Sequence, residues 1–171
     1  MVAAASAAAP LPASTVTASA MPRLWLRPRQ PDVAKLVRDL DAMFHDLYPA
    51  ESNHLVDIET LAGPDMHFFV VRQAGKAIGT GALWHRDPEY GEIKRIYVKP
   101  EARGLKLGKV ILAALEGNAR AHGIGLIKLE TGTLQPEALG LFAKHGFVAC
   151  GPYADYPTDD PYSVFMEKHL G

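Results

Sequence analysis

The chain has few of the features that characterise secreted or membrane proteins. Its only cysteine is Cys150, so no disulfide can form within the chain, and we expect a cytoplasmic protein. We expect the Cys150 side chain to be a small buried apolar group. No apolar run approaches the roughly 18 residues that cross a bilayer, so the sequence predicts no membrane partner.

An excess of charge of one sign is also missing. The 18 Lys and Arg residues nearly balance the 19 Asp and Glu residues, for a formal net charge of −1. Nucleic-acid-binding proteins are usually strongly basic, so we expect no nucleic-acid partner. The seven histidines show no H-x-x-x-H spacing and no cluster with cysteine, which predicts no metal site. A length of 171 residues with 48% hydrophobic and 22% charged residues is typical of one globular domain.

The first twenty residues contain no charged side chain and are rich in Ala, Ser, Thr and Pro. A secretory signal would need a basic start and an unbroken apolar stretch, but Pro10 and Pro12 interrupt this one. We interpret residues 1–21 as a disordered tail, or as a segment that precedes a true start at Met21. Residues 22–171 are then expected to form a single domain.

Helical and strand patterns alternate along the rest of the chain, which predicts a mixed α/β fold. Apolar residues recur every three or four positions from Val33 to Leu47, which predicts a helix that begins at Pro31 and ends before Pro49. Further helices are expected at Glu51–Leu61, about Leu105–Ala121 and Pro136–Lys144. Strands are expected at Leu24–Leu26, Met66–Arg72, Lys76–His85, Glu92–Val98, Gly125–Glu130, Phe147–Cys150 and Ser163–Lys168.

The strand Glu92–Val98 departs from strict alternation. Ile96 and Val98 share a face, whereas Ile93, three residues before Ile96, falls on the opposite one. One explanation is a β-bulge near Lys94–Arg95, which would bring all three to one face and leave backbone groups free to bind an extended ligand. The other is a strand that is buried on both faces.

A glycine-containing turn, Arg103-Gly104-Leu105-Lys106-Leu107-Gly108-Lys109, separates this strand from the next helix. Free N–H groups at a helix N-terminus with basic side chains nearby suit a diphosphate. The spacing does not match a Walker loop, because only three residues separate Gly104 from Gly108, nor does it match a dinucleotide fingerprint. An ordinary strand-to-helix turn is the alternative.

Taken together, these segments resemble the GNAT superfamily of N-acetyltransferases. The segment Glu92–Val98, Pro100 and the turn Arg103–Gly108 are similar to its acetyl-CoA motif, usually written [RQ]-x-x-G-x-[GA]. Leu129–Gly132 and Leu141–Phe147 resemble its later strand–helix–strand segment, and residues 152–166 resemble a branch of small bacterial members. The resemblance implies an α/β (α+β) fold with a mixed, splayed central sheet and helices on both faces. Homodimers are common in this family.

The resemblance also implies that acetyl-CoA is the cosubstrate and suggests where it binds. The backbone of Ile96, Tyr97 and Val98 would pair with the pantetheine arm. The pyrophosphate would lie on the turn, whose members are Arg103, Gly104, Leu105, Lys106, Leu107, Gly108 and, after it, Lys109. Lys106 stands where the motif usually has its first glycine, so its side chain would either crowd the phosphate or add a cation. Phe142 stands where many members have a tyrosine that protonates the leaving thiolate; water, Tyr153 or Tyr156 would have to replace it.

Amine acetylation requires a base, because a typical alkylammonium has a pKa near 10.4. The family often uses a carboxylate on the bulged strand, and Glu92 is our candidate for the catalytic base. Glu51, His54, His85 and Tyr156 are expected on the acceptor side, and His85 is a second candidate base.

The sequence therefore predicts transfer of an acetyl group from acetyl-CoA to a small-molecule amine by direct attack. Cys150 has no evident base partner, which disfavours an acyl-enzyme. One alternative is a non-catalytic acyl-CoA-binding or sensor module, in keeping with Phe142. The other is acetylation of a protein N-terminus or lysine, which would need an open peptide groove.

Overall fold

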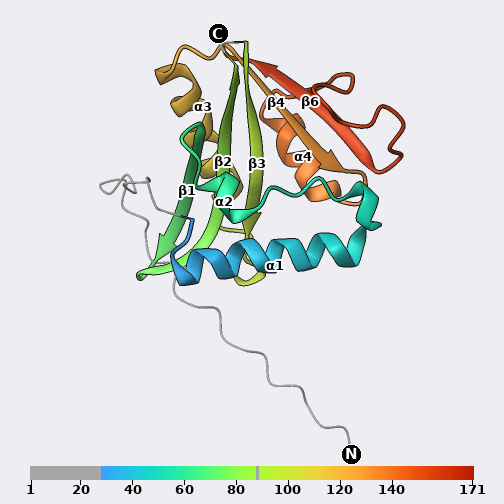
Figure 1. Cartoon of the computed structure of the whole chain (residues 1–171). Helices are drawn as coiled ribbons and strands as arrows, with labels where there is room; N and C mark the ends of the chain where they lie inside the picture. The colour runs from blue at the N-terminus through green and yellow to red at the C-terminus, as the bar shows by residue number, and fades with distance from the viewer. Residues whose placement is uncertain (1–27, 88) are drawn as a thin grey trace, which may run out of the picture.

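The computed structural model describes residues 28–87 and 89–171 (Figure 1). The expected tail at residues 1–21 and the expected strand Leu24–Leu26 lie outside these residues. The helices are α1 (Pro31–Leu47), η1 (Ala50–Ser52), α2 (Ile58–Leu61), η2 (Pro100–Ala102), α3 (Leu107–Ala121) and α4 (Pro136–Lys144). The strands are β1 (Met66–Gln73), β2 (Lys76–Asp87), β3 (Tyr90–Val98), β4 (Leu126–Gly132), β5 (Val148–Ala149) and β6 (Ser163–His169).

Most elements lie where the sequence predicts them, but the helix expected over Glu51–Leu61 is wrong. It is divided into η1 and α2, and residues 53–57 between them are not helical. The cause is local, because the Asp57 side chain accepts a hydrogen bond from the Thr60 N–H at 2.7 Å and caps α2 at its start. The strand expected at Phe147–Cys150 is also shorter, with two paired residues.

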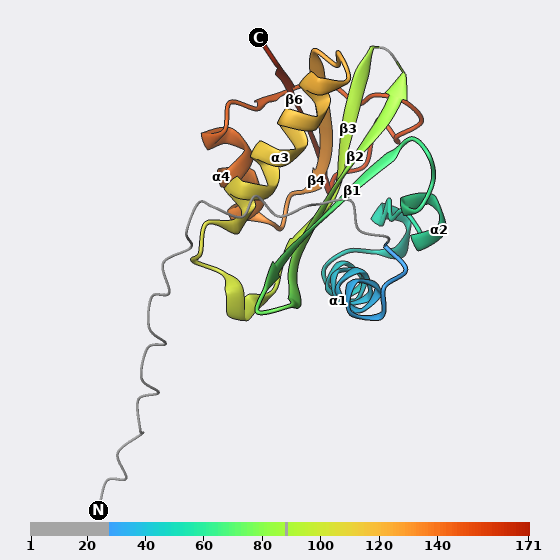
Figure 2. The ribbon, with the colours of Figure 1, turned by 90° about the vertical axis from the view of Figure 1, so that its left-hand side faces the viewer.

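The six strands form one sheet in the order β1-β2-β3-β4-β6-β5. All neighbours are antiparallel except β3 and β4, which are parallel. Helices α1 and α2 cover one face of the sheet, and α3 and α4 cover the other (Figure 2). This confirms the predicted mixed sheet with helices on both faces. No helix of the described part of the chain is both long and apolar enough to cross a membrane.

Each face of the sheet has its own apolar core. Successive side chains of β1 point into different cores: Phe68 packs with α1, and Phe69 packs with α3. The α1 face is built on Val33, Leu36 and Val37, which are all at most 4% exposed. The α3 face contains Ile111, Leu112, Leu115, Phe142 and Phe147.

The parallel pairing of β3 with β4 is short, which splays the sheet. It covers Gly91–Ile93 on β3 and Ile127–Leu129 on β4, and neither strand continues the pairing beyond these residues. Strand β3 goes on to Val98 and β4 to Gly132. The two strand ends therefore diverge and leave space between them for a ligand.

A β-bulge lies on β3 where the splay begins, as the first of our two explanations predicts. The pairing with β2 shifts between Thr80–Tyr97 and Ala82–Lys94, and Arg95 has a left-handed φ of 58°. The Thr80 hydroxyl donates a hydrogen bond to the Arg95 carbonyl at 3.0 Å and holds the bulge. Ile93, Ile96 and Val98 consequently pack on the same core.

The turn that follows β3 contains two residues with left-handed backbone. Gly104 has a φ of 84°, and Lys106, at the N-cap of α3, has a φ of 57°. The position that the family motif gives to glycine therefore has the backbone that glycine favours, although a lysine occupies it here.

Three histidines meet at the other end of the sheet. The rings of His67, His85 and His122 lie with centroids 4.0–4.8 Å apart, and Asn118 contacts the first two. Burial, together with the neighbouring His85 and His122, lowers the pKa of His67 to about 4. Burial also lowers the pKa of His85. His67 and His85 are thus held in their neutral form at neutral pH.

The low pKa of His67 predicts a loss of stability in acid. An unfolded histidine binds its proton near pH 6.5, whereas His67 in the folded chain binds it near pH 4. Stability should be complete above pH 6.5 and should fall as the pH drops from 6.5 toward 4. His67→Gln should reduce this fall in urea denaturation midpoints, while His169→Gln, at an exposed position, should leave it unchanged. Equal acid sensitivity of the wild type and both variants would contradict the assignment.

The left-handed backbone of Lys106 predicts that glycine is tolerated there. Lys106→Gly relieves the backbone strain but gives the unfolded chain more freedom, so the free energy of unfolding should stay equal or rise by up to about 1 kcal/mol. Lys106→Val should instead destabilise by about 1–2 kcal/mol, because a branched Cβ fits this conformation poorly. Chemical denaturation of the two variants measures the difference; a glycine variant less stable than the valine variant would contradict this reading of the backbone.

Candidate active site

A groove runs along the end of β3 and over the turn that precedes α3. Its lining residues come from the end of α1, β3, η2 and the turn after it, the start of α3, and the segment before and within α4: Met43, Leu47, Ile96, Tyr97, Val98, Ala102, Arg103, Gly104, Lys106, Leu107, Gly108, Leu134, Gln135, Pro136, Glu137, Ala138 and Leu141. We call this the cofactor groove. Eight of the ten predicted cofactor residues line it, and Leu105 and Lys109 do not. Leu105 is 53% exposed outside the groove.

The cofactor groove has the chemistry of a phosphate site at one end. Arg103 and Lys106 line it, and the first turn of α3 carries no acidic residue. Arg103 Nη1 lies 3.9 Å from Glu137 Oε2, and both side chains are about half exposed or more. The guanidinium is thus free to bind an anion beside the N–H groups of the helix start. The residues present therefore fit a pyrophosphate.

A second cavity lies inside the splay between β3 and β4. We call it the acceptor pocket. It is lined by Leu40, Phe44, Tyr48, Ser52, Asn53, His54, Leu55, Val56, Ile93, Lys94, Arg95, Ile96, Leu129, Glu130, Thr131, Gly132, Gln135, Ala138, Leu141, Phe142 and Tyr162. Ile96, Gln135, Ala138 and Leu141 also line the cofactor groove. The two cavities therefore meet at the bulged strand and the start of α4.

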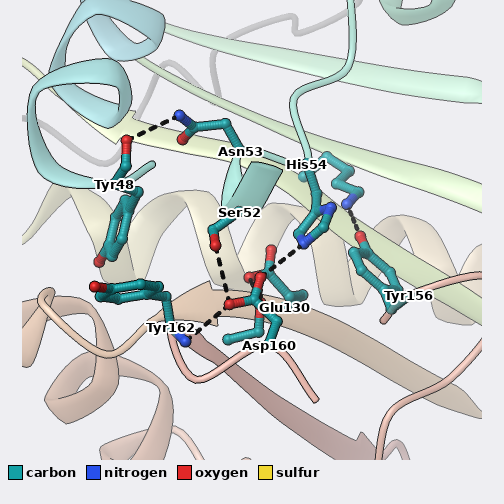
Figure 3. A network of polar contacts seen from close by, with 10 residues as sticks. Tyr48, Ser52, Asn53, His54, Glu130, Tyr156, Asp160 and Tyr162 are labelled. Atoms are coloured by element: carbon teal, nitrogen blue, oxygen red, sulfur yellow. Dashed lines mark hydrogen bonds and ion pairs between the residues drawn. The ribbon is translucent and has the colours of Figure 1, made fainter. Parts of the chain in front are cut away.

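A polar cluster forms one wall of the acceptor pocket (Figure 3). Asp160 lies at its centre, although Asp160 is not itself one of the residues that line the cavity. This carboxylate accepts hydrogen bonds from the Tyr162 N–H at 2.9 Å, the Ser52 hydroxyl at 3.0 Å and the Ser163 hydroxyl at 3.3 Å, and His54 Nε2 lies at 3.2 Å. Since a carboxylate only accepts, His54 Nε2 carries the proton that it donates to Asp160. The non-helical segment 53–57 brings His54 to this wall.

Glu130 stands beside Asp160, and the Ser163 hydroxyl links the two. This hydroxyl contacts Glu130 Oε1 at 2.8 Å and Asp160 Oδ2 at 3.3 Å. Burial raises the pKa of Glu130 above its ordinary value, and the Ser163 hydrogen bond offsets only part of the rise. A carboxylate with a raised pKa in a ligand cavity is the usual form of a general base.

Asp160 has the opposite behaviour. Burial by itself would raise the pKa of Asp160, but its hydrogen bonds outweigh burial and lower that pKa. The donors are the Tyr162 N–H, His54, Ser52 and Ser163. Neighbouring carboxyl groups with pKa values moved apart take different chemical roles: Asp160 stays ionised while Glu130 can accept a proton.

Glu92, the base that the sequence favours, lies outside both cavity linings. It is 1% exposed, and its carboxylate is 3.0 Å from Lys94 Nζ and 3.3 Å from Arg86 Nε. The Tyr156 and Tyr153 hydroxyls donate to its Oε1 at 2.6 Å and 3.2 Å. This carboxylate therefore binds the segment that contains both tyrosines to β3.

The two tyrosine candidates for protonating the leaving thiolate are both engaged with Glu92. Phe142 lines the acceptor pocket and is 5% exposed, but it has no proton to give. Tyr153 and Tyr156 use their hydroxyls on Glu92, and burial raises the pKa of both phenols far above their ordinary value. Tyr156 also packs edge-on against His54, with ring centroids 5.2 Å apart.

The other two acceptor-side candidates lie away from the pocket. Glu51 is an exposed member of η1 and lines neither cavity. His85 belongs to the histidine cluster. It pairs with Gly91, at the opposite end of β3 from the splay. Of the four candidates, His54 lines the pocket. Tyr156 does not line it, but its ring packs against the His54 ring.

Sequence reasoning missed Glu130 and Asp160. Glu130 is visible in the sequence as a carboxylate that ends an apolar strand before Thr131-Gly132, in a segment that we had matched to the family. Asp160 also lies in a segment that we had matched to the family, but its loop comes beside Glu130 only because the following strand β6 pairs with β4. Among residues 28–87 and 89–171, no group of three or more His, Cys, Asp or Glu side chains could hold a metal ion.

Comparisons with known proteins agree with this geometry. The family model described as acetyltransferase (GNAT) family matches residues 33–147. An IAA acetyltransferase of Azospirillum brasilense is 46% identical over 144 residues, which are 84% of this chain and 94% of that protein.

Two solved structures are also similar. One, from Klebsiella pneumoniae and assigned as an acyl-CoA N-acyltransferase, is 33% identical with a TM-score of 0.72 and covers 85% of this chain and 94% of its own. The PaiA N-acetyltransferase of Thermoplasma acidophilum, in complex with coenzyme A, shares the fold at 20% identity with a TM-score of 0.62, over 81% of this chain and 91% of its own. Together with the family match, these likenesses show that the chain belongs to the GNAT family and is an acetyl-CoA-dependent acyltransferase.

Proposed function

We propose that this enzyme acetylates the amine of a small molecule held in the acceptor pocket. The observation that carries the proposal is the junction of the two cavities, where Ile96, Gln135, Ala138 and Leu141 line both. A donor in the cofactor groove and an amine in the acceptor pocket would meet there. The Azospirillum brasilense relative is named for IAA as its acceptor, which supports a small acceptor.

Acetyl-CoA, when bound, supplies the acetyl group as a thioester: a C–N bond to the amine forms, the C–S bond breaks and the thiol leaves. We propose that the backbone of Ile96–Val98 binds its pantetheine arm, because this part of β3 is not paired with β4. Arg103, Lys106 and the first turn of α3 would bind the pyrophosphate.

We propose Glu130 as the group that removes the proton from the amine. It lines the acceptor pocket, and its raised pKa suits a base that works near neutral pH. Ser163 holds the carboxylate, and the Asp160–His54 pair keeps the same wall polar. Glu92 remains the base predicted from the family pattern, but its buried carboxylate and four polar contacts favour an anchoring role.

The choice of base predicts different results for two matched variants. Glu130→Gln should lower kcat by about 10²–10⁴-fold, with little change in acetyl-CoA affinity. In the wild type, the rate should fall as the pH drops through the raised pKa of Glu130, and the variant should lose this dependence. Glu92→Gln should mainly lower the melting temperature. A Glu92→Gln variant that loses both turnover and the pH dependence, beside an active Glu130→Gln variant, would return the role to Glu92.

The proposed pyrophosphate site predicts a loss of cofactor affinity when Arg103 is changed. Arg103→Ala should raise the dissociation constant of acetyl-CoA roughly tenfold, as expected for one charge-assisted hydrogen bond at an exposed site. Arg120→Ala is the control, because Arg120 is similarly exposed on the last turn of the same helix. Calorimetric titration measures both, and equal affinity of the two variants would refute the phosphate site.

A further inference from the structure

We infer that the acceptor is an arylalkylamine: a primary amine on an aromatic body, without a carboxylate. This inference rests on the proposed function, since it names the substrate class of the same pocket. It is carried by the charges, the unpartnered buried polar atoms and the ring surfaces that line the acceptor pocket.

The charges of the pocket favour an amine over an acid. Each of the two cations in its lining already has a carboxylate partner: Lys94 pairs with Glu92 at 3.0 Å, and Arg95 pairs with Asp41. The carboxylate of Glu130, by contrast, accepts a hydrogen bond from the Ser163 hydroxyl. A carboxylate on the acceptor would therefore face Glu130 with the cations already occupied, whereas an amine fits beside it.

An unpartnered acceptor in the lining points to the same chemistry. Asn53 Oδ1 is buried and has no hydrogen-bond partner within the chain. The amide nitrogen, Nδ2, donates to the Tyr48 carbonyl at 3.3 Å, so the oxygen is the end of the amide that has no partner. Since a buried polar atom normally has a partner, the N–H of an amine in the pocket would satisfy Asn53.

One unpartnered donor balances this acceptor. Arg95 Nε is buried without an acceptor, although the same guanidinium binds Asp41 and the Val56 carbonyl. Because Asp41 already neutralises its charge, Arg95 suits a neutral oxygen, such as a carboxamide, better than a second carboxylate. The class therefore includes amines with a neutral oxygen near the amino group.

The aromatic body is inferred from a row of rings in the lining. The Tyr48 ring lies between two others. Its centroid is 6.0 Å from that of Phe44 and 5.9 Å from that of Tyr162, whose plane is inclined to it by 70°. Figure 3 shows Tyr48 and Tyr162 next to each other and apart from His54. The Tyr48 hydroxyl accepts from the Leu134 N–H at 3.0 Å, and a Cβ on Gly132 would lie 2.0 Å from it. The ring surface is thus held rigidly, as a binding wall for another ring requires.

The test is a panel of amines at saturating acetyl-CoA, with release of the CoA thiol as the readout and rates expressed per unprotonated amine. Phenethylamine, phenylalaninamide, phenylalanine, butylamine and putrescine separate the ring, the neutral oxygen, the carboxylate and the second cation. We expect phenethylamine and phenylalaninamide to exceed the other three in kcat/KM by at least about tenfold. The comparison of phenylalaninamide with phenylalanine changes only the carboxamide into a carboxylate.

A variant of the ring wall tests the aromatic part separately. Tyr162→Leu should lower the ratio of kcat/KM for phenethylamine to that for butylamine by about fivefold or more. Val148→Ala, on the exposed edge strand β5, should leave the ratio unchanged. An unchanged ratio in Tyr162→Leu would overturn the aromatic assignment.

The outcomes separate the inference from the proposed function. Fastest turnover of phenylalanine, butylamine or putrescine would overturn the arylalkylamine class and leave small-molecule acetylation standing. Calorimetric binding of acetyl-CoA without turnover of any amine in the panel or in a broader amine set would overturn both.

Discussion

The site depends on how short the parallel pairing between β3 and β4 is. Strands β3 and β4 are hydrogen-bonded only up to Ile93 and Leu129, and beyond these residues each continues without the other. The bulge at Arg95 turns β3 away at this point, and the Thr80 hydroxyl fixes the turned backbone. Had the pairing continued, the strands would fill the space that the acceptor pocket occupies. The irregular strand therefore creates both the free backbone edge and the cavity beside it.

Glu92 connects this strand to a distant segment of the chain. Two cations pair with its carboxylate, so a buried charge is tolerated, and two tyrosine hydroxyls bind it. These tyrosines belong to the segment that leads to Asp160 and Tyr162. Tyr162 lines the pocket, and Asp160 contacts the lining residues Ser52 and His54. Burial of one carboxylate thus positions a second one more than 60 residues away in the sequence. A glutamate at this place can be essential for the site without touching the amine.

Two neighbouring carboxyl groups, Glu130 in the pocket lining and Asp160 beside it, differ in their surroundings. Asp160 receives enough hydrogen bonds to stay ionised, and burial makes Glu130 the weaker acid. The apolar and aromatic remainder of the lining lowers the local dielectric and strengthens this difference. The two cations of the same lining, Lys94 and Arg95, are already paired with carboxylates of the chain. In our proposal, proton transfer and acceptor choice both follow from this one arrangement of charges.

The sequence by itself determined most of the local features: most of the helices and strands, and the turn from Arg103 to Gly108 with its basic residues. These follow from short-range periodicity and from backbone preferences, which neighbouring residues decide. The sequence offered the bulge near Lys94–Arg95 as one of two explanations, and the register of β3 against β2 decided between them. It did not determine which polar residues share the pocket. His54, Glu130 and Asp160 meet only because β4, β6 and the 53–57 segment pack together, whereas His85 is carried to the far end of β2. Contacts between residues far apart in the chain are made by tertiary packing, and no local pattern encodes them.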